Sequence, residues 1–426
     1  MLFLCYLVFI YFAFSFKHKA SPATFLFFIY ISSLIGAVAI GYDYKIDSEE
    51  KVWNFIFLAL ILAFFILPWN CLVYSVKIMT PDHQRLRTLT SILLFINIVI
   101  FIVFSISIFY SFSSIVDYSA FKNGGESGDF IKALPINNTL YLLALYLHPT
   151  AYFLMPLHFY YLMTGDRKMS YLCLLFSLNV VLHGLTIFSR SGFIIFVFLY
   201  GAYLPFFYKK CSQKTKNTIK LSLGLLSTSA LTVFFFVTAN RFENEIGYND
   251  ILDSNTYITN PIIFSLFDYG CQWYRNGSTV INSYQFETLN GQLSFPFPIL
   301  IADKLELINY PIGEIEARLY DFWGIYYDRF NGVTANLLFD FGYIGTFIFA
   351  ALYSSFVFWL RPGKNGLPFG KLMAVAALFL LPAMGIFNYE MKTVYYNLLI
   401  VYTFLICGYL NGSGRKKTPE QGVLPA

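Results

Sequence analysis

The sequence predicts an all-α, polytopic integral membrane protein, and three observations lead to that fold class. Of its 426 residues, 57% are hydrophobic and only 12% are charged, whereas an ordinary soluble domain carries about 25% charged residues. Apolar runs of roughly 17 to 25 residues recur along the chain, and this is the length at which a helix crosses a hydrocarbon core. A transmembrane barrel would instead show short segments of alternating hydrophobicity.

Eleven apolar segments are long enough, or nearly so, to be transmembrane helices. The first is short for a full crossing, and four prolines predict kinks that neighbouring helices accommodate: Pro68, Pro149, Pro156 and Pro382. No charged segment precedes the first apolar run, so we expect a retained helix and no cleaved signal peptide. The predicted spans are residues 2–16, 22–42, 53–76, 89–113, 139–163, 169–188, 191–208, 221–239, 334–360, 371–389 and 393–410.

The distribution of lysine and arginine predicts the orientation of these spans. If the loop with Lys17 and Lys19 is cytoplasmic, alternation places residues 77–88, 164–168, 209–220, 361–370 and the C-terminal tail on the same side. Counted with Lys371, that side holds 18 of the 29 basic residues and only three of the 24 acids. Because short cytoplasmic loops are enriched in lysine and arginine, we expect an external N-terminus and a cytoplasmic C-terminus.

The spans divide the chain into four parts. Membrane helices one to eight occupy residues 1–239, a large external loop follows at 240–333, helices nine to eleven occupy 334–410, and residues 411–426 form a cytoplasmic tail. The chain has no internal repeat. It also has no matched pair of broken helices, a feature whose presence would favour a transporter. It also lacks a nucleotide-binding motif and cysteine or histidine spacing for a metal, so no cofactor or metal is expected.

Arg190 is the most unusual residue, because it lies in the SRSG stretch of an otherwise apolar run from Met169 to Tyr208. A charge at the centre of a membrane helix costs about 2.5 to 3.5 kcal/mol on insertion scales. The run is too long for one helix, so two spans meet near Arg190 at the outer membrane boundary. There the guanidinium either grips a phosphate group or extends towards lipid headgroups.

The predicted external loop adds further arginines and aromatic side chains. Its arginines are Arg241, Arg275, Arg318 and Arg329, and aromatic residues surround them in CQWYRNGS (271–278) and EIEARLYDFWGIYYDRFNG (314–332). Aromatic faces and charged groups together are typical of a carbohydrate site. The alternative is an amphipathic segment at the membrane surface, anchored by Trp273, Trp323, Tyr326 and Tyr327.

Several acids are candidates for a general base that accepts the proton of a substrate hydroxyl. In the external loop these are Glu314, Glu316, Asp321 and Asp328, each of which could equally be a solvated or arginine-paired acid. Asp340 lies inside a long apolar helix and therefore needs a partner, for which Arg190 and Arg329 are candidates, unless it lies at the interface. The histidines His148, His158 and His183 lack zinc-site spacing and are expected to be hydrogen-bonded within the membrane, unless His183 lines the site.

The layout resembles that of the O-antigen polymerases of the Wzy type. The resemblance rests on the SRSG turn at 189–192, the long external loop before a late helix, the segment GVTANLLFDFGYIGTFIF (332–349) and the abundance of Phe, Tyr and Ile. It implies a metal-independent, inverting glycosyltransferase of the bacterial inner membrane that acts in lipopolysaccharide biosynthesis. Such an enzyme joins undecaprenyl-diphosphate-linked repeat units on the periplasmic face.

The resemblance also implies roles for individual residues. Arg190 matches an arginine of the family, and we expect Arg190, Asp328 and Asp340 to be catalytic. Substrate binding is expected of Arg241, Arg275, Arg318, Arg329, Trp323 and Tyr327. The expected partners are the lipid-linked oligosaccharide, a chain-length regulator and a flippase, and not nucleic acid. An O-antigen ligase is the main alternative, and a lipid-linked oligosaccharide flippase is the second.

Overall fold

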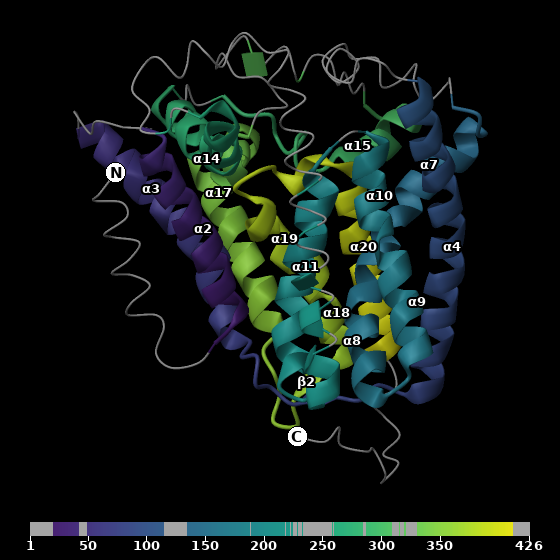
Figure 1. Ribbon diagram of the computed structural model, residues 1–426. Helices are drawn as coiled ribbons and strands as arrows, with labels where there is room; N and C mark the ends of the chain where they lie inside the picture. Colours follow the sequence, from purple (N-terminus) through teal and green to yellow (C-terminus); the bar gives the residue numbers. More distant parts are fainter. Residues whose placement is uncertain are drawn as a thin grey trace. The chain divides into compact units, whose positions relative to one another are not determined.

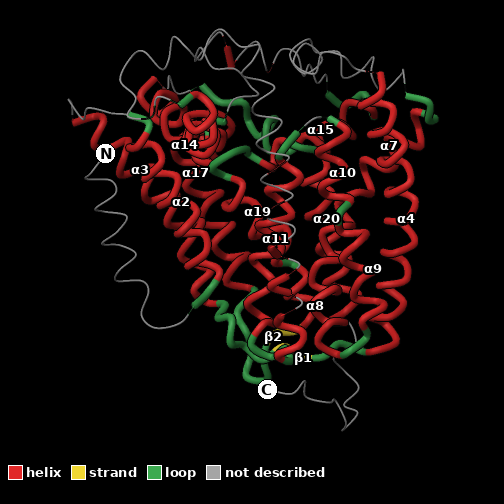
Figure 2. Tube along the Cα trace, viewed as in Figure 1, coloured by secondary structure: helices red, strands yellow, loops and turns green. Residues whose placement is uncertain are grey.

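A computed structural model describes most of the predicted membrane region (Figure 1). The described residues are 20–41, 49–114, 134–187, 189–217, 219–221, 223–224, 228, 232, 258, 260–283, 287–308, 315, 319–320 and 330–411. Within them almost all regular structure is helical, which confirms the all-α prediction (Figure 2). Six helices are long and apolar enough to cross a membrane, and three shorter apolar helices accompany them.

The helices follow the predicted spans closely wherever the structure describes them. The first span, 2–16, lies outside the described residues, as does most of 221–239, so the count of eleven spans stays a prediction. In chain order the helices are α2 (Pro22–Ala39), α3 (Glu49–Ile66), η1 (Leu67–Cys71), α4 (His83–Ser114), α7 (Asn138–Leu147), η2 (His148–Phe153), α8 (Leu154–Thr164), α9 (Arg167–Ser177), α10 (Asn179–Thr186), α11 (Ser191–Tyr208), α14 (Pro261–Ser283), α15 (Pro296–Lys304), α17 (Gly332–Trp359), α18 (Phe369–Met373), α19 (Val375–Met384), η3 (Glu390–Lys392) and α20 (Val394–Asn411).

Local residue chemistry explains where several helices begin and end. The Asn137 side chain accepts a hydrogen bond from the Thr139 amide at 2.8 Å and so caps α7. Between α8 and α9, Gly165 adopts a φ of 90°, which a residue with a side chain rarely adopts, and Asp166 caps α9 through the Met169 amide. A glycine and a helix cap therefore make the tight turn between these two helices.

The chain folds as two compact units, each built from separated stretches of sequence. Unit 1 comprises residues 1–74, 238–361 and 378–397, and unit 2 comprises residues 75–237, 362–377 and 398–426. In unit 1, α14 packs on α2 and α17, and α17 packs on α3 and η1. The buried Trp69 indole donates to the Tyr353 hydroxyl at 2.9 Å, which in turn donates to the Leu378 carbonyl at 2.8 Å.

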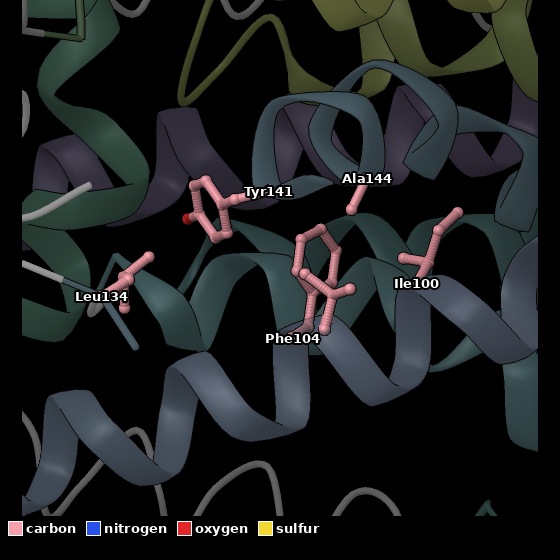
Figure 3. Close-up of a cluster of buried hydrophobic side chains, with 6 residues drawn as sticks. Ile100, Phe104, Leu134, Tyr141 and Ala144 are labelled. Atoms are coloured by element: carbon pink, nitrogen blue, oxygen red, sulfur yellow. The ribbon is translucent and has the colours of Figure 1, made fainter. Parts of the chain in front are cut away.

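Unit 2 is a helix bundle in which α4 packs against α7, α9 and α10, while α11 packs against α8 and α10. Part of its core is a cluster of apolar side chains from α4, α7 and the residues before α7 (Figure 3): Ile100, Val103, Phe104, Leu134, Tyr141 and Ala144. The Asn179 amide donates to the carbonyl and side-chain oxygens of Asn97 at 2.8 and 3.0 Å, where the chain turns between α9 and α10. These buried amides hold the span 167–186 to α4 at its break.

One end of unit 2 gathers segments that are far apart in the sequence. Strands β1 (Ile78–Met79) and β2 (Leu367–Pro368) pair in parallel, and the Lys210 ammonium donates to the Val76 carbonyl at 3.1 Å. The Arg85 guanidinium donates to the Tyr409 carbonyl, also at 3.1 Å. Three of the segments predicted to be cytoplasmic, 77–88, 209–220 and 361–370, thus contribute residues to the same end of this unit. This agrees with their assignment to one side of the membrane.

Candidate functional site

The SRSG stretch forms the connection between α10 and α11, as predicted. The two helices cross with their backbones in contact, because glycines occupy the positions of closest approach. A Cβ atom on Gly192 would lie 2.4 Å from the Val180 carbonyl oxygen, and one on Gly184 would lie 2.8 Å from the Ser189 carbonyl oxygen. Both glycines are therefore required for this geometry, in which any side chain would force the helices apart.

Hydrogen bonds fix the backbone of this turn. The Gly184 carbonyl accepts from the Ile187 amide at 3.2 Å and from the Ser189 amide at 2.8 Å. The Ser189 hydroxyl oxygen accepts from the Ser191 amide at 3.2 Å and lies 2.8 Å from the Ser191 hydroxyl. A serine that binds the amide two residues later is a common turn device, and here it holds Arg190 between two anchored neighbours.

Arg190 occupies the N-terminal capping position of α11 and is only 8% exposed. A side chain that reaches lipid headgroups would lie on the protein surface, so this burial disfavours the headgroup-anchoring alternative. The N-terminus of a helix carries a partial positive charge and presents unpaired amide groups. A guanidinium and a helix N-terminus together favour an anion, and phosphate suits both.

Asp340 is fully buried in α17, two residues before a kink at Gly342, whose φ is 66°. Its carboxylate accepts hydrogen bonds from the backbone amides of Leu293 and Ser294, at 3.0 and 2.7 Å. The Asp340 backbone carbonyl also accepts from the Gly291 amide at 3.3 Å. The partners of this buried carboxylate are therefore backbone amides and the Ser294 hydroxyl, and these contacts hold the turn at 287–295 against α17.

The turn at 287–295 is also joined to the segment between α19 and α20. The Ser294 hydroxyl forms a short hydrogen bond with the buried Tyr389 hydroxyl. The Asn397 side-chain amide donates to the Ser294 carbonyl at 3.3 Å and to the Met391 carbonyl at 2.9 Å. A polar network inside unit 1 thus connects Asp340 with the residues that surround Glu390.

Glu390 is a buried acid that the sequence analysis did not single out. It begins the short helix η3, and only 8% of it is exposed. Burial raises the pKa of its carboxyl to about 7, while the positive charge of Lys392 and a hydrogen bond with the Asn388 side chain oppose that shift. The sequence feature that could have pointed to Glu390 is its position as the single acid in a three-residue connection between two predicted spans. Nothing in the sequence indicated that so short a connection would be buried.

The aromatic residues of α14 differ from what the sequence led us to expect. Trp273 is 3% exposed, donates from its indole nitrogen to the Ser33 hydroxyl at 2.6 Å, and packs edge-on against the Tyr30 ring. It is thus a core residue, which leaves it unavailable for sugar stacking or for anchoring at lipid headgroups. Arg275, on the same helix, is half-buried, and its Nε lies 3.4 Å from the Asn276 side-chain oxygen.

Most of the other predicted site residues lie outside the described residues. Their catalytic or binding roles accordingly stay predictions. They are Arg241, Arg318, Arg329, Trp323, Tyr327 and Asp328, together with the alternative acids Glu314, Glu316 and Asp321 and the aromatic Tyr326.

The three intramembrane histidines lie in the interior of unit 2. The His158 Nδ1 atom is 2.9 Å from the Ser170 carbonyl oxygen and 2.9 Å from its hydroxyl oxygen, so this side chain joins α8 to α9. His148 and His183 stack with ring centroids 4.2 Å apart, and the His148 Nδ1 atom lies 2.9 Å from the Leu145 carbonyl oxygen. Within the described part of the chain, no three histidine, cysteine or acidic side chains cluster so that they could hold a metal ion.

Comparison with known proteins adds no assignment, since no family model, curated protein or solved structure matches this chain. The function is therefore argued from the chemistry of the residues and from the resemblance in layout.

Proposed function

We propose that this protein is an O-antigen polymerase. It transfers a growing oligosaccharide from undecaprenyl diphosphate to the end of a new lipid-linked repeat unit, at the periplasmic face of the bacterial inner membrane. The observation that carries the proposal is the buried Arg190 at the N-terminus of α11, in a turn that two glycines and two serines hold in place. A rigid cationic turn at the end of two membrane helices suits a diphosphate whose lipid tail stays in the bilayer.

The chemistry of glycosyl transfer gives this arginine a function. As the bond between the sugar anomeric carbon and the diphosphate oxygen breaks, negative charge grows on the departing lipid diphosphate. A planar guanidinium can bind two phosphate oxygens at once and so stabilise that charge in the transition state. Because the leaving group is already a diphosphate, the reaction needs no nucleotide sugar, and the charge can be stabilised by arginine alone.

The location of Arg190 within unit 2 supports a periplasmic site. Helix α11 runs from Ser191 to Tyr208, so its two ends are about 27 Å apart, close to the thickness of the hydrocarbon core. Lys209 and Lys210 follow its other end, where Lys210 contacts the Val76 carbonyl. If that basic end is cytoplasmic, as the positive-inside rule requires, the Arg190 turn faces the periplasm.

Charge placement favours a transferase over a flippase. A flippase for an anionic lipid-linked sugar would need charged residues along a cavity at membrane depth. Within the six long described helices, the lysines, arginines and acids are Arg85 and Arg87 near the start of α4, Arg167 and Lys168 at the start of α9, and Asp340 in α17. The interior of these helices therefore offers one charged side chain, and that side chain is bound to backbone amides.

The proposal is tested with purified protein in detergent and synthetic undecaprenyl-diphosphate-linked repeat units. A polymerase forms a ladder of products with two or more repeats, and no second compartment is needed. A ligase would form no ladder but would transfer the sugar to lipid A-core when that acceptor is added, and a flippase would form no product.

A deletion strain separates polymerase from ligase in cells. Loss of a polymerase leaves single repeat units attached to the lipid A-core, whereas loss of a ligase leaves full-length polymer on the carrier lipid. Polymer on the carrier lipid in the deletion strain would refute the proposal.

A further inference from the structure

Three segments of unit 1 meet around the first turn of α17. Helix α14 packs against α17 (Figure 1), and its Asn276 side-chain amide donates to the Phe330 carbonyl at 3.1 Å, just before α17 begins. The Val333 amide donates to the Gly385 carbonyl at 3.1 Å, in the turn that follows α19. These contacts hold α14, the start of α17 and the turn after α19 against one another.

Each of the three segments contributes one ring to an aromatic cluster, which consists of Tyr269, Phe330 and Phe387. The Tyr269 ring centroid lies 4.7 Å from that of Phe330 and 5.6 Å from that of Phe387. The Phe330 and Phe387 centroids are 6.4 Å apart. All three side chains are half-buried, whereas Trp273, one turn further along α14, is a core residue. The aromatic cluster is therefore held in place and only partly covered.

Two buried polar side chains follow this cluster at the start of α17. Asn331 occupies the N-terminal capping position and Thr334 lies three residues later, and each is 2% exposed. The Asn331 Oδ1 and Thr334 Oγ1 atoms have no hydrogen-bond partner within the described part of the chain. A capping asparagine usually accepts from an amide of the first helical turn. In the described first turn of α17, Asn331 makes no such bond, and the Val333 amide binds the Gly385 carbonyl instead.

An aromatic cluster beside unsatisfied polar atoms matches the chemistry of a sugar ring. A pyranose presents C–H groups on its faces, which pack on aromatic rings, and hydroxyl groups at its edge. The Asn331 amide oxygen can accept from such a hydroxyl, and the Thr334 hydroxyl can donate or accept. A phosphate would gain nothing from the three rings, because aromatic faces are electron-rich. The chemistry therefore favours the sugar over the diphosphate.

The orientation predicted from the basic residues places these side chains on the side of the proposed substrate. Helix α17 runs from Gly332 to Trp359, and the segment 361–370 follows its other end. If 361–370 is cytoplasmic, as the positive-inside rule requires, the start of α17 faces the periplasm. A lipid-linked oligosaccharide on that face can reach the aromatic cluster.

We propose that the aromatic cluster, Asn331 and Thr334 bind a pyranose ring of the lipid-linked oligosaccharide, an inference that rests on the proposed polymerase function. One face of the sugar packs on the half-buried rings. Its hydroxyl groups hydrogen-bond to the Asn331 Oδ1 and Thr334 Oγ1 atoms. The site lies wholly within unit 1, and it recognises the repeat unit without taking part in bond formation.

The test measures binding of the free repeat-unit oligosaccharide, released from its lipid by mild acid, to the purified protein by saturation-transfer difference NMR. The detergent must lack a sugar headgroup, because a maltoside would compete. Phe387→Leu keeps an apolar side chain but removes the aromatic face, and Thr334→Val keeps the side-chain shape but removes the hydroxyl. Each should weaken binding by about 3- to 10-fold.

The chain offers a matched control for each substitution. Thr346 is another buried threonine of α17 whose hydroxyl has no partner among the described residues, but it lies 12 residues further along the helix. Phe64 is half-buried and pairs edge-on with Phe347 in the same unit. Thr346→Val and Phe64→Leu should leave binding unchanged. Because the Thr334 hydroxyl has no described partner, Thr334→Val should keep or raise the melting temperature, which separates lost binding from lost fold.

The outcomes distinguish the sugar site from the proposed function, because ladder formation is measured separately on the same proteins. If wild type forms the ladder while Phe387→Leu and Thr334→Val bind the oligosaccharide as tightly as wild type, the sugar site alone is overturned. Weakened binding in both variants without a ladder from wild type supports the sugar site and overturns the polymerase proposal. A wild type that shows neither binding nor a ladder overturns both.

Discussion

Replacing Gly192 with alanine tests how the Arg190 turn is built. The new Cβ atom would lie 2.4 Å from the Val180 carbonyl oxygen and 3.2 Å from the Val181 Cα atom. Both neighbours are backbone atoms of α10, so no side chain can rotate away to make room. An ordinary carbon–oxygen contact needs about 3.4 Å, and the two helices must therefore separate locally by about 1 Å.

Two opposing terms set the expected loss of stability. Forcing an extra methyl group into a packed interface costs typically 1 to 3 kcal/mol, and a clash with backbone belongs in the upper part of that range. Alanine in place of glycine within a helix recovers roughly 0.5 to 1 kcal/mol. The net destabilisation of Gly192→Ala is therefore about 1 to 2 kcal/mol.

The matched control is Gly408→Ala, which makes the same change in α20 of the same unit. A Cβ atom on Gly408 meets nothing within 4 Å, so this substitution should be neutral or slightly stabilising. Thermal unfolding of the purified proteins in detergent, followed by the loss of monodisperse protein, compares the two variants. The shift at Gly192 should also displace Arg190 and reduce polymerisation by about 100-fold, since an error of 1 Å at a reacting centre has such an effect. Equal melting temperatures for the two variants would refute the close-contact explanation.

Substitutions at three further positions probe other parts of the structure. Arg190→Ala should abolish polymerisation in cells while the protein still inserts, and Arg190→Lys should restore little because the planar two-point grip is lost; normal chain lengths on a gel would contradict this role. Asp340→Asn should destabilise unit 1 by about 1 to 3 kcal/mol, because its amide would face the Leu293 amide, and faster proteolysis at 287–295 would report it. Tyr353→Phe leaves the Trp69 indole without its acceptor and should lower the free energy of unfolding by a similar amount, which a lower melting temperature would report. An unchanged melting temperature would show that the bond is dispensable.

Much of the helical architecture could be predicted from the sequence, because the length of an apolar segment and its lack of charge identify a membrane span. The span predicted at 191–208 coincides with α11, and that predicted at 334–360 differs from α17 by two residues at its start and one at its end. The turn at Arg190 also followed from the sequence, since a 40-residue apolar run with one arginine has to contain two helices. These are local properties, and local spacing determines them.

The polar network of unit 1 could not be predicted, because its contacts join residues that are distant in the sequence. Asp340 accepts from amides 46 and 47 residues earlier, and Ser294 binds a tyrosine 95 residues later. The kink at Gly342, which no motif in the sequence marks, interrupts a helix that reads as continuous. Glu390 was overlooked for the same reason, as its burial comes from packing and not from its neighbours in the chain.

The interleaving of the two units sets the order in which this protein can be completed during synthesis. Strand β1 at Ile78–Met79 is synthesised almost 290 residues before its partner β2 at Leu367–Pro368. Unit 1 needs residues up to 397, and unit 2 needs the last helix, α20. The helices of unit 2 from α4 to α11 are therefore made well before β2 and α20, the later parts of the same unit. A chain that stops before α20 would leave both units incomplete, and such a chain is a target for membrane quality control.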